Sequence, residues 1–327
     1  MREGAAIGSI SPRAQLAVAG SDRATYLQGL LTNDIQALTP GSGCYAAWLS
    51  PQGRMLTDMH VLQSSGMILM DVPADLAAAT LARLDQFLFS EDVRLESLEE
   101  SLTSVWVHGP QAASVIEGVV SGFPGRRSST SEGGGRTPPR DWSDYHHDTA
   151  SFGSEAVSIA RIDQLGVPGY CVFLARASES PFVEAAVAAG ARAVSPESIL
   201  AARIEAGYPV FGVDMTDDTI PLEAGIEQRA VSFSKGCFVG QEVVIRVLHR
   251  GGGRVARKLV GLKLGTAAGA GAKIVSGQRE IGFLTSAAIS PRLGPIALGY
   301  VHRDFTAAGT SVEVDGHPAT VTGLPMA

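Results

Sequence analysis

The residue pattern of the chain changes at Gly251-Gly252-Gly253, and this change constrains the fold more than any other feature of the sequence. Upstream, strand-like runs alternate with segments whose apolar residues recur at helical spacing. Downstream, the chain consists of short β-type runs separated by Gly and Pro, at 259–264, 280–289, 296–301 and 312–321. Short strands in series are typical of a β-barrel. We therefore expect an α+β protein with mixed or antiparallel sheets and helices over residues 1–250, and a C-terminal β-barrel domain over residues 251–327.

The first region contains a predicted hairpin that places several polar residues. Cys44–Leu49 and Met55–Leu62 are predicted strands around the turn at 50–53. Further strands are expected at 14–19, 67–72, 93–98, 104–108, 156–162 and 170–174, and helices around Tyr26, after Pro73, before Val120, after Pro181 and after Pro196. Ser, Gly, Pro and Arg dominate residues 121–140, so we expect a mobile loop from about residue 121 to about 147.

Composition excludes several classes of protein. The 327 residues suffice for two or three domains, and the net charge of −7 argues against nucleic-acid binding. A local basic patch is interpreted as a solvated face, at Arg246, Arg250, Arg254, Arg257 and Lys258. Cys44, Cys171 and Cys237 are too scattered for a disulfide framework or a zinc site. The sequence contains neither a signal-peptide pattern nor an apolar run long enough for a membrane span, so we expect a cytoplasmic protein without membrane contact.

The stretch from Ser234 to Glu242 combines a lysine, a thiol and two glycines. Apolar residues recur at helical spacing from Val239 onward, which places Cys237 just before or at a helix N-terminus, with Glu242 in the first turns. Unpaired amides and Lys235 both favour a thiolate, so we expect the pKa of Cys237 to be lowered. An alternative is open: the glycines only permit a tight turn and Cys237 packs as a small hydrophobe.

Two carboxylates and several histidines are weaker candidates. Asp58 in the strand 55–62 and Glu205 before Gly207 either face solvent or line a cleft, where each can hydrogen-bond a nitrogen heterocycle. His146-His147-Asp148 is interpreted as surface polarity, because adjacent side chains seldom converge on one metal ion. We expect no metal site. Cys237 alone cannot hold an iron–sulfur cluster, which takes four ligands, although it can donate one ligand or react.

The run from Lys235 to Glu242, Lys-Gly-Cys-Phe-Val-Gly-Gln-Glu, resembles the signature of the YgfZ-type folate-binding proteins that support iron–sulfur enzymes. These are relatives of the aminomethyltransferase, or T-protein, of the glycine cleavage system. Other segments are similar to that superfamily as well, namely 20–34, 50–58, 203–209, 221–225, 282–286 and 297–301. The resemblance therefore touches most of the chain.

The resemblance implies a T-protein-like three-lobed fold around a channel for tetrahydrofolate or a derivative. Asp58 and Glu205 are then the folate-facing carboxylates, since a carboxylate pairs with the amino-pyrimidine edge of a pterin. Lys235 and Cys237 are the implied catalytic residues. The remaining implied cofactor-binding residues are Gln241, Glu242 and Arg246. The hairpin from Gly53 to Asp58 lacks one of two successive acidic residues found in aminomethyltransferases, which argues against lipoyl-linked aminomethyl transfer.

Three functions are compatible with these features. The leading hypothesis is a tetrahydrofolate-binding accessory protein for assembly or repair of iron–sulfur clusters, with client iron–sulfur proteins or assembly factors as partners. The second is a folate-dependent one-carbon transferase, either an aminomethyltransferase or a demethylase. The third is a non-catalytic interaction module, which requires no folate.

Overall fold

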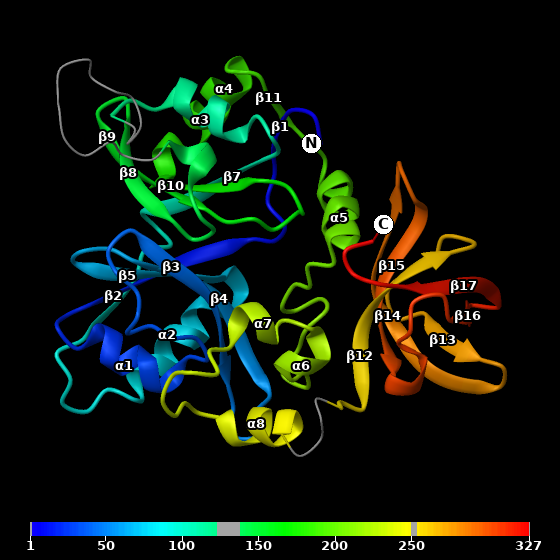
Figure 1. The fold of residues 1–327 in the computed structure, drawn as a ribbon. Coiled ribbons are helices and arrows are strands. Elements are labelled where there is room, and N and C mark those ends of the chain that lie inside the picture. The colour runs from blue at the N-terminus through cyan, green and yellow to red at the C-terminus, as the bar shows by residue number, and fades with distance from the viewer. Residues whose placement is uncertain (1, 123–137, 250–253, 327) are drawn as a thin grey trace. The chain divides into compact units, whose positions relative to one another are not determined.

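The computed structural model describes residues 2–122, 138–249 and 254–326 (Figure 1). Most of the predicted mobile loop, residues 123–137, lies outside the described residues. The chain divides into two compact units, and each is built from separated stretches of sequence. The first unit comprises Met1–Arg23, Leu38–Cys44 and His60–Ser195. The second comprises Ala24–Ala37, Tyr45–Met59 and Pro196–Ala327.

A six-stranded mixed sheet forms much of the first unit, in the order β11-β1-β7-β10-β9-β8. Its strands are β1 (Ala5–Ile7), β7 (Leu102–His108), β8 (His147–Phe152), β9 (Glu155–Arg161), β10 (Gly169–Ala175) and β11 (Ala191–Ala193). β1 pairs in parallel with β11, whereas β7, β9 and β10 pair antiparallel. Helices α3 (Ala112–Val119) and α4 (Glu179–Ala188) lie over this sheet (Figure 1).

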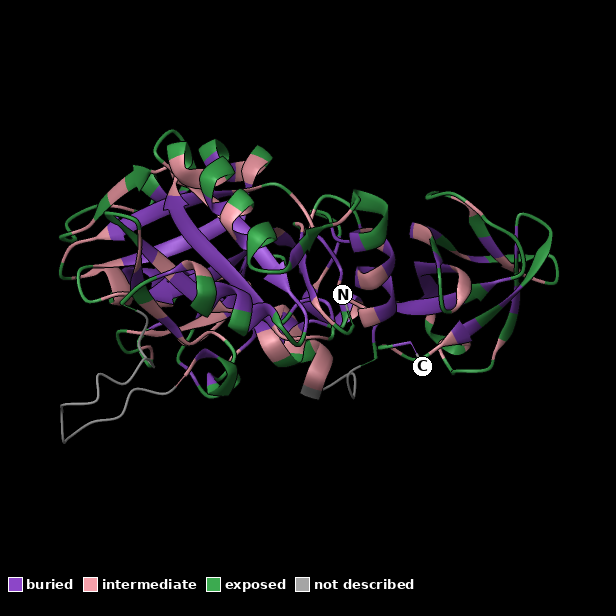
Figure 2. Ribbon diagram, turned by 90° about the horizontal axis from the view of Figure 1, so that it is seen from above, coloured by how far each residue is buried: buried purple, intermediate pink, exposed green. Residues whose placement is uncertain are grey.

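Strand β10 shows why both faces of this sheet are buried. Tyr170, Val172 and Leu174 pack in the cluster that includes Ile116 of α3 and Phe182 of α4. Cys171 and Phe173 alternate with them and pack against Leu62 and Leu69 on the opposite face. Successive side chains of a strand point to opposite faces, so this nearly uninterrupted apolar run fills two cores. Figure 2 shows the same pattern, with buried strands and helices exposed on their outer turns.

Strand β8 begins at His147, where the expected loop from about residue 121 to about 147 ends, and it pairs with β9. The side chain of His147 is buried and its Nε2 lies 3.0 Å from the carbonyl oxygen of Gln63. The interpretation of His146-His147-Asp148 as surface residues is therefore wrong for His147.

A five-stranded sheet has the order β3-β4-β5-β2-β6. Its strands are β2 (Arg13–Ala19), β3 (Ser42–Leu49), β4 (Met55–Gln63), β5 (Met67–Pro73) and β6 (Arg94–Ser97). β2 pairs antiparallel with β5 and β6, and β4 pairs antiparallel with β5. Helix α1 (Arg23–Leu30) follows β2 along the chain, and helix α2 (Ala77–Asp85) follows β5. The predicted hairpin is confirmed, since β3 and β4 flank the turn at 50–53.

A closed six-stranded barrel ends the second unit, which confirms the predicted α+β fold with a C-terminal barrel (Figure 1). Its strands are β12 (Arg257–Leu264), β13 (Lys273–Ser276), β14 (Arg279–Ser290), β15 (Gly294–His302), β16 (Ser311–Val314) and β17 (His317–Thr322). The run predicted as one strand at 312–321 forms two strands, because the chain turns at Asp315 and Gly316, both of which have positive φ. β13 is a strand that the sequence pattern did not reveal.

Four helices of the second unit connect the barrel to the segments that carry the candidate site. They are α5 (Pro196–Ala206), α6 (Pro221–Ala224), α7 (Glu227–Ala230) and α8 (Gln241–His249). Short 3-10 turns occur at Ala74–Leu76, Pro139–Asp141, Arg176–Ser178 and Arg303–Phe305. Ile204 of α5 packs with Leu259, Ile296 and Leu298 of the barrel. α5 is thus fixed to the barrel wall by apolar contact.

Buried His108 leads to a prediction of pH-dependent stability. Burial lowers its pKa from 6.5 to about 4, although its Nε2 lies 3.1 Å from the Gly8 carbonyl oxygen. The imidazole is therefore neutral in the folded protein, whereas the unfolded chain takes up a proton below about pH 6.5. The contribution of neutral His108 to stability should be complete above pH 6.5. As the pH falls from 6.5 towards 4, the free energy of unfolding should fall by about 3 kcal/mol.

Urea denaturation at several pH values between about 7 and 4 checks this expectation. His108→Gln removes the imidazole, so its free energy of unfolding should fall less over this interval than that of the wild type. Parallel curves for the two proteins would contradict the assignment to His108.

Candidate functional site

A buried tyrosine–carboxylate pair lies on the β3–β4 hairpin. Tyr45 Oη donates a hydrogen bond of 2.7 Å to Asp58 Oδ2, and both side chains are buried. Burial raises the pKa of Tyr45 well above 10, and the nearby Asp58 carboxylate raises it further. The phenol therefore stays protonated and remains a donor. Asp58 is therefore buried and does not face solvent, and its role towards folate stays a prediction.

An arginine lies between two tyrosine rings beside this pair. Cζ of Arg229, on α7, is 4.6 Å from the Tyr45 ring centre and 3.8 Å from the Tyr208 ring centre. These distances are those of cation–π contacts. Sequence reasoning did not select Tyr45, Tyr208 or Arg229 as site residues. Tyr208 does belong to a segment that carried the family resemblance, which is the one signal that pointed towards it.

Glu205 belongs to a different cluster, in which its carboxylate contacts the barrel. It accepts hydrogen bonds from Ser290 Oγ at 2.5 Å and from Arg292 Nη2 at 3.3 Å. Arg203, two residues earlier on α5, pairs with Asp214 and donates to the carbonyl oxygen of Tyr208 at 3.0 Å. The two carboxylates predicted to face folate thus have different partners: Asp58 binds Tyr45, and Glu205 binds residues of the barrel. The role of Glu205 towards folate stays a prediction.

Cys237 is exposed on loop 231–240, which connects α7 to α8. The thiol therefore does not pack as a small hydrophobe, and that alternative is wrong. Helix α8 begins at Gln241, whose Oε1 accepts a hydrogen bond of 3.3 Å from the Phe238 amide. This contact ties the start of α8 to the loop before it and gives Gln241 a structural role. Glu242 and Arg246 are exposed on α8, and their predicted roles remain predictions.

Lys235 is buried, and its ammonium contacts the carboxyl end of α1. Nζ donates to the carbonyl oxygens of Gln28 at 2.6 Å, Leu31 at 2.7 Å and Asn33 at 2.8 Å. A cation suits this position, because the last carbonyls of a helix carry partial negative charge. These contacts show Lys235 as an anchor of loop 231–240. Its predicted electrostatic effect on Cys237 stays a prediction.

Backbone hydrogen bonds fix the same loop on both sides of Cys237. The Ser232 amide donates to the Thr32 carbonyl at 3.0 Å, and the Val239 amide donates to the Gly29 carbonyl at 3.2 Å. Gly240 has φ of +83°, and a Cβ there would lie 2.5 Å from the carbonyl oxygen of Ser50. Glycine is therefore required at 240 for both conformation and space. The exposed thiol is presented by a loop with a defined path.

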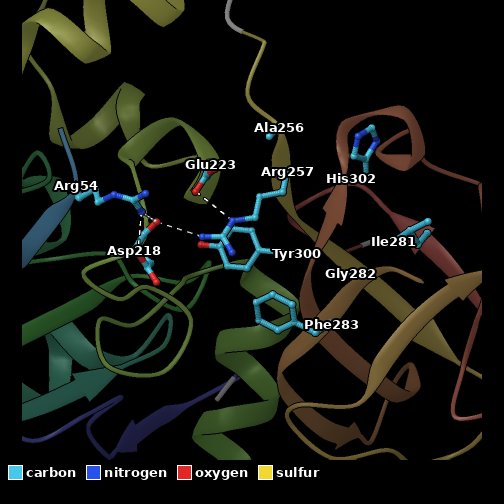
Figure 3. A pocket seen from close by; sticks show the side chains of 10 residues that line it. All are labelled: Arg54, Asp218, Glu223, Ala256, Arg257, Ile281, Gly282, Phe283, Tyr300 and His302. Atoms are coloured by element: carbon cyan, nitrogen blue, oxygen red, sulfur yellow. Dashed lines mark hydrogen bonds and ion pairs between the residues drawn. The ribbon is translucent and has the colours of Figure 1, made fainter. Parts of the chain in front are cut away.

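A pocket of about 490 Å³ lies elsewhere in the second unit (Figure 3). Arg54 pairs with Asp218 at 2.9 Å and Arg257 pairs with Glu223 at 3.2 Å. The ring of Tyr300 lies below the Arg257 guanidinium, 4.9 Å from its Cζ. Both arginines are neutralised by carboxylates in the pocket wall, so we assign no ligand to the pocket.

In residues 2–122, 138–249 and 254–326, no group of three or more His, Cys, Asp or Glu side chains is placed to hold a metal ion. No helix in these residues is long and apolar enough to cross a membrane.

Two protein-family models match this chain, one upstream of the barrel and one over the barrel itself. The model of the GCVT N-terminal domain matches residues 1–235, and that of the glycine cleavage T-protein C-terminal barrel domain matches residues 257–327. The chain is similar to an aminomethyltransferase of Rubrobacter xylanophilus, at 29% identity over 100% of this chain and 83% of the relative. One from Synechocystis sp. is 28% identical over 96% of this chain and 82% of the relative. The crystal structure of glycine cleavage system aminomethyltransferase T from Bartonella henselae has the same fold, with a TM-score of 0.83, 24% identity and coverage of 99% of this chain and 86% of that chain.

The buried ammonium of Lys235 leads to a prediction of stability. Lys235→Met keeps the aliphatic stem but leaves three carbonyl oxygens without this donor, so the free energy of unfolding should fall by about 3 kcal/mol. Lys273→Met is the matched control, because Lys273 donates to Glu280 at 2.7 Å on the surface. Exposed ion pairs contribute little, so the control should change little. Urea denaturation measures both, and equal losses would contradict a special role for Lys235.

Proposed function

Because the chain belongs to the family of the glycine cleavage T-protein, we propose that it is a tetrahydrofolate-binding protein of the YgfZ-type branch. In this role it supports the assembly or repair of iron–sulfur clusters in client enzymes. The arrangement of loop 231–240 carries the proposal: its anchors are buried, while Cys237 at its centre is exposed. A thiol held in this way suits a reaction with a partner more than a contribution to the core.

The folate part of the proposal is supported by the chemistry of Asp58. A carboxylate that accepts two neighbouring N–H donors pairs with the amino-pyrimidine edge of a pterin. Tyr45 fixes the Asp58 carboxylate through its hydroxyl, and Arg229 adds positive charge beside the Tyr45 ring. A preorganised acceptor of this kind loses little conformational entropy when a ligand binds.

The iron–sulfur part of the proposal depends on what one thiol can do. Cys237 alone cannot hold a cluster, which usually requires four protein ligands. Its exposure permits it to supply one ligand at an interface, or to react as a nucleophile or redox thiol. We therefore place the cluster in the client protein and the thiol in the accessory protein.

The second candidate is a folate-dependent aminomethyl transferase. The similarity to curated aminomethyltransferases along nearly the whole chain favours it. It requires formation of methylene-tetrahydrofolate from an aminomethyl donor by the purified protein. Turnover in that assay would favour this candidate over the accessory role, and its absence with both lipoyl-protein and methylated-amine donors would remove it.

Asp58→Asn tests the folate site. The variant keeps the shape of the side chain but loses its charge, and charge-assisted hydrogen bonds contribute about 1.5–3 kcal/mol. Isothermal calorimetry with 5-formyltetrahydrofolate should show binding to the wild type that is weakened about 10- to 100-fold in Asp58→Asn. Asp75→Asn, an exposed change of the same chemistry, should bind like the wild type. Unaltered affinity in Asp58→Asn would remove this carboxylate from the site.

Cys237→Ser tests the proposed role in cells. In a strain that lacks the gene, the wild-type protein should restore the activity of iron–sulfur enzymes, and Cys237→Ser should not, because a hydroxyl is a poor substitute for a thiolate ligand or nucleophile. Cys44→Ser, which removes a partly buried thiol on β3, should restore activity. If Cys237→Ser restores full activity at equal protein level, the assigned role of the thiol is wrong.

A further inference from the structure

Asn33, which follows α1, contacts three separate segments of the second unit. Its Nδ2 donates to the carbonyl oxygens of Tyr45 at 2.8 Å and Arg229 at 3.0 Å. Its own carbonyl oxygen accepts a hydrogen bond of 2.8 Å from Lys235 Nζ. One residue therefore joins strand β3, helix α7 and loop 231–240.

Each of these contacts ends at a part of the proposed site. Tyr45 carries the hydroxyl that binds Asp58, and the guanidinium of Arg229 lies on the Tyr45 ring. Lys235 is two residues before Cys237 in a loop whose path is fixed by backbone hydrogen bonds. The Asp58 pair and loop 231–240 are thus linked through Asn33 by hydrogen bonds that are joined by the covalent structure of Tyr45 and Asn33.

Thr32 forms a parallel link beside Asn33. Its hydroxyl donates to the Ala230 carbonyl oxygen at 2.5 Å and accepts from the Ala47 amide at 2.8 Å. Thr32 is fully buried. Buried polar groups are costly to leave unpaired, so a displacement at one end of such a network should be accommodated along its length.

We propose that Asn33 is a positioning residue that couples the Asp58 site to loop 231–240, so that a reduced folate bound at Asp58 changes the reactivity of the Cys237 thiol. This inference rests on the proposed function, because it requires folate to bind at Asp58. It adds a regulatory relation: the thiol responds to whether the folate site is occupied. Asn33 touches neither the ligand nor the sulfur in this scheme, and acts through Tyr45 and Lys235.

The test compares alkylation of Cys237 with and without folate. Iodoacetamide modifies the folded protein, and mass spectrometry of the Cys237 peptide gives the rate. In the wild type, saturating 5-formyltetrahydrofolate should change this rate about 5-fold or more. In Asn33→Ala, at a folate concentration that calorimetry shows to be saturating, the ratio of the two rates should be close to one. If Asn33→Ala does not fold, Asn33→Ser takes its place. The shorter serine side chain cannot bridge the carbonyl oxygens of Tyr45 and Arg229, so the ratio of the two rates should again be close to one.

Gln28→Ala is the matched control. The Gln28 side chain binds the amides of Ile35 and Gln36 at 2.7 and 3.2 Å, in the turn that contains Asn33. Its removal disturbs that turn but leaves the Asn33 side chain in place, so the folate response should persist. A response retained in folded Asn33→Ala or Asn33→Ser, or absent from folate-bound wild type, would overturn the inference. Wild-type protein that fails to bind folate at all would instead remove the proposed function on which it rests.

Discussion

The contact between the Lys235 ammonium and three carbonyl oxygens at the end of α1 is the interaction on which the candidate site depends. A charge removed from water is strongly unfavourable unless it is hydrogen-bonded, so this contact permits few other conformations of the loop. The ammonium donates to the main-chain carbonyl oxygens of Gln28, Leu31 and Asn33, which lie near the N-terminal end of the sequence. These contacts hold loop 231–240, which carries Cys237, in place. The lysine in the signature thus has a structural role that its position beside a thiol does not reveal.

Asp58 and Glu205, the two carboxylates that the sequence singled out, serve different parts of the second unit. Asp58 is bound by a phenol and lies in a group that includes two tyrosines and an arginine. Glu205 is bound by Ser290 and Arg292 of the barrel, next to the Arg203–Asp214 pair. Because α5 carries both Glu205 and Arg203, its end is connected to the barrel by ionic as well as apolar contacts. Asp58 therefore contacts the hydroxyl of a tyrosine, whereas Glu205 joins the end of α5 to the barrel.

Local pattern sufficed to predict the hairpin that bears Asp58, the helix after Cys237 and most of the barrel, since strand and helix periodicities are properties of short windows. It failed for β8 and β13, which are short and lie among Ser, Gly and charged residues. The partners within the site were beyond reach for another reason. Lys235 and Gln28 are 207 residues apart, and Asn33 and Arg229 are 196 apart. Only the folded chain brings such pairs together, so neither Asn33 nor Arg229 carries a local signal of its contacts.

The second unit is assembled from pieces at opposite ends of the chain, and this has a consequence for biosynthesis. Segments 24–37 and 45–59 leave the ribosome long before Pro196–Ala327, with which they form one compact body. Until translation reaches Lys235, the carbonyl oxygens of Gln28, Leu31 and Asn33 lack the ammonium that binds them in the folded chain. Contacts between residues so distant in sequence form late, because a long stretch of chain must first be ordered. The nascent protein therefore cannot form the contacts that hold loop 231–240 until translation has passed residue 240.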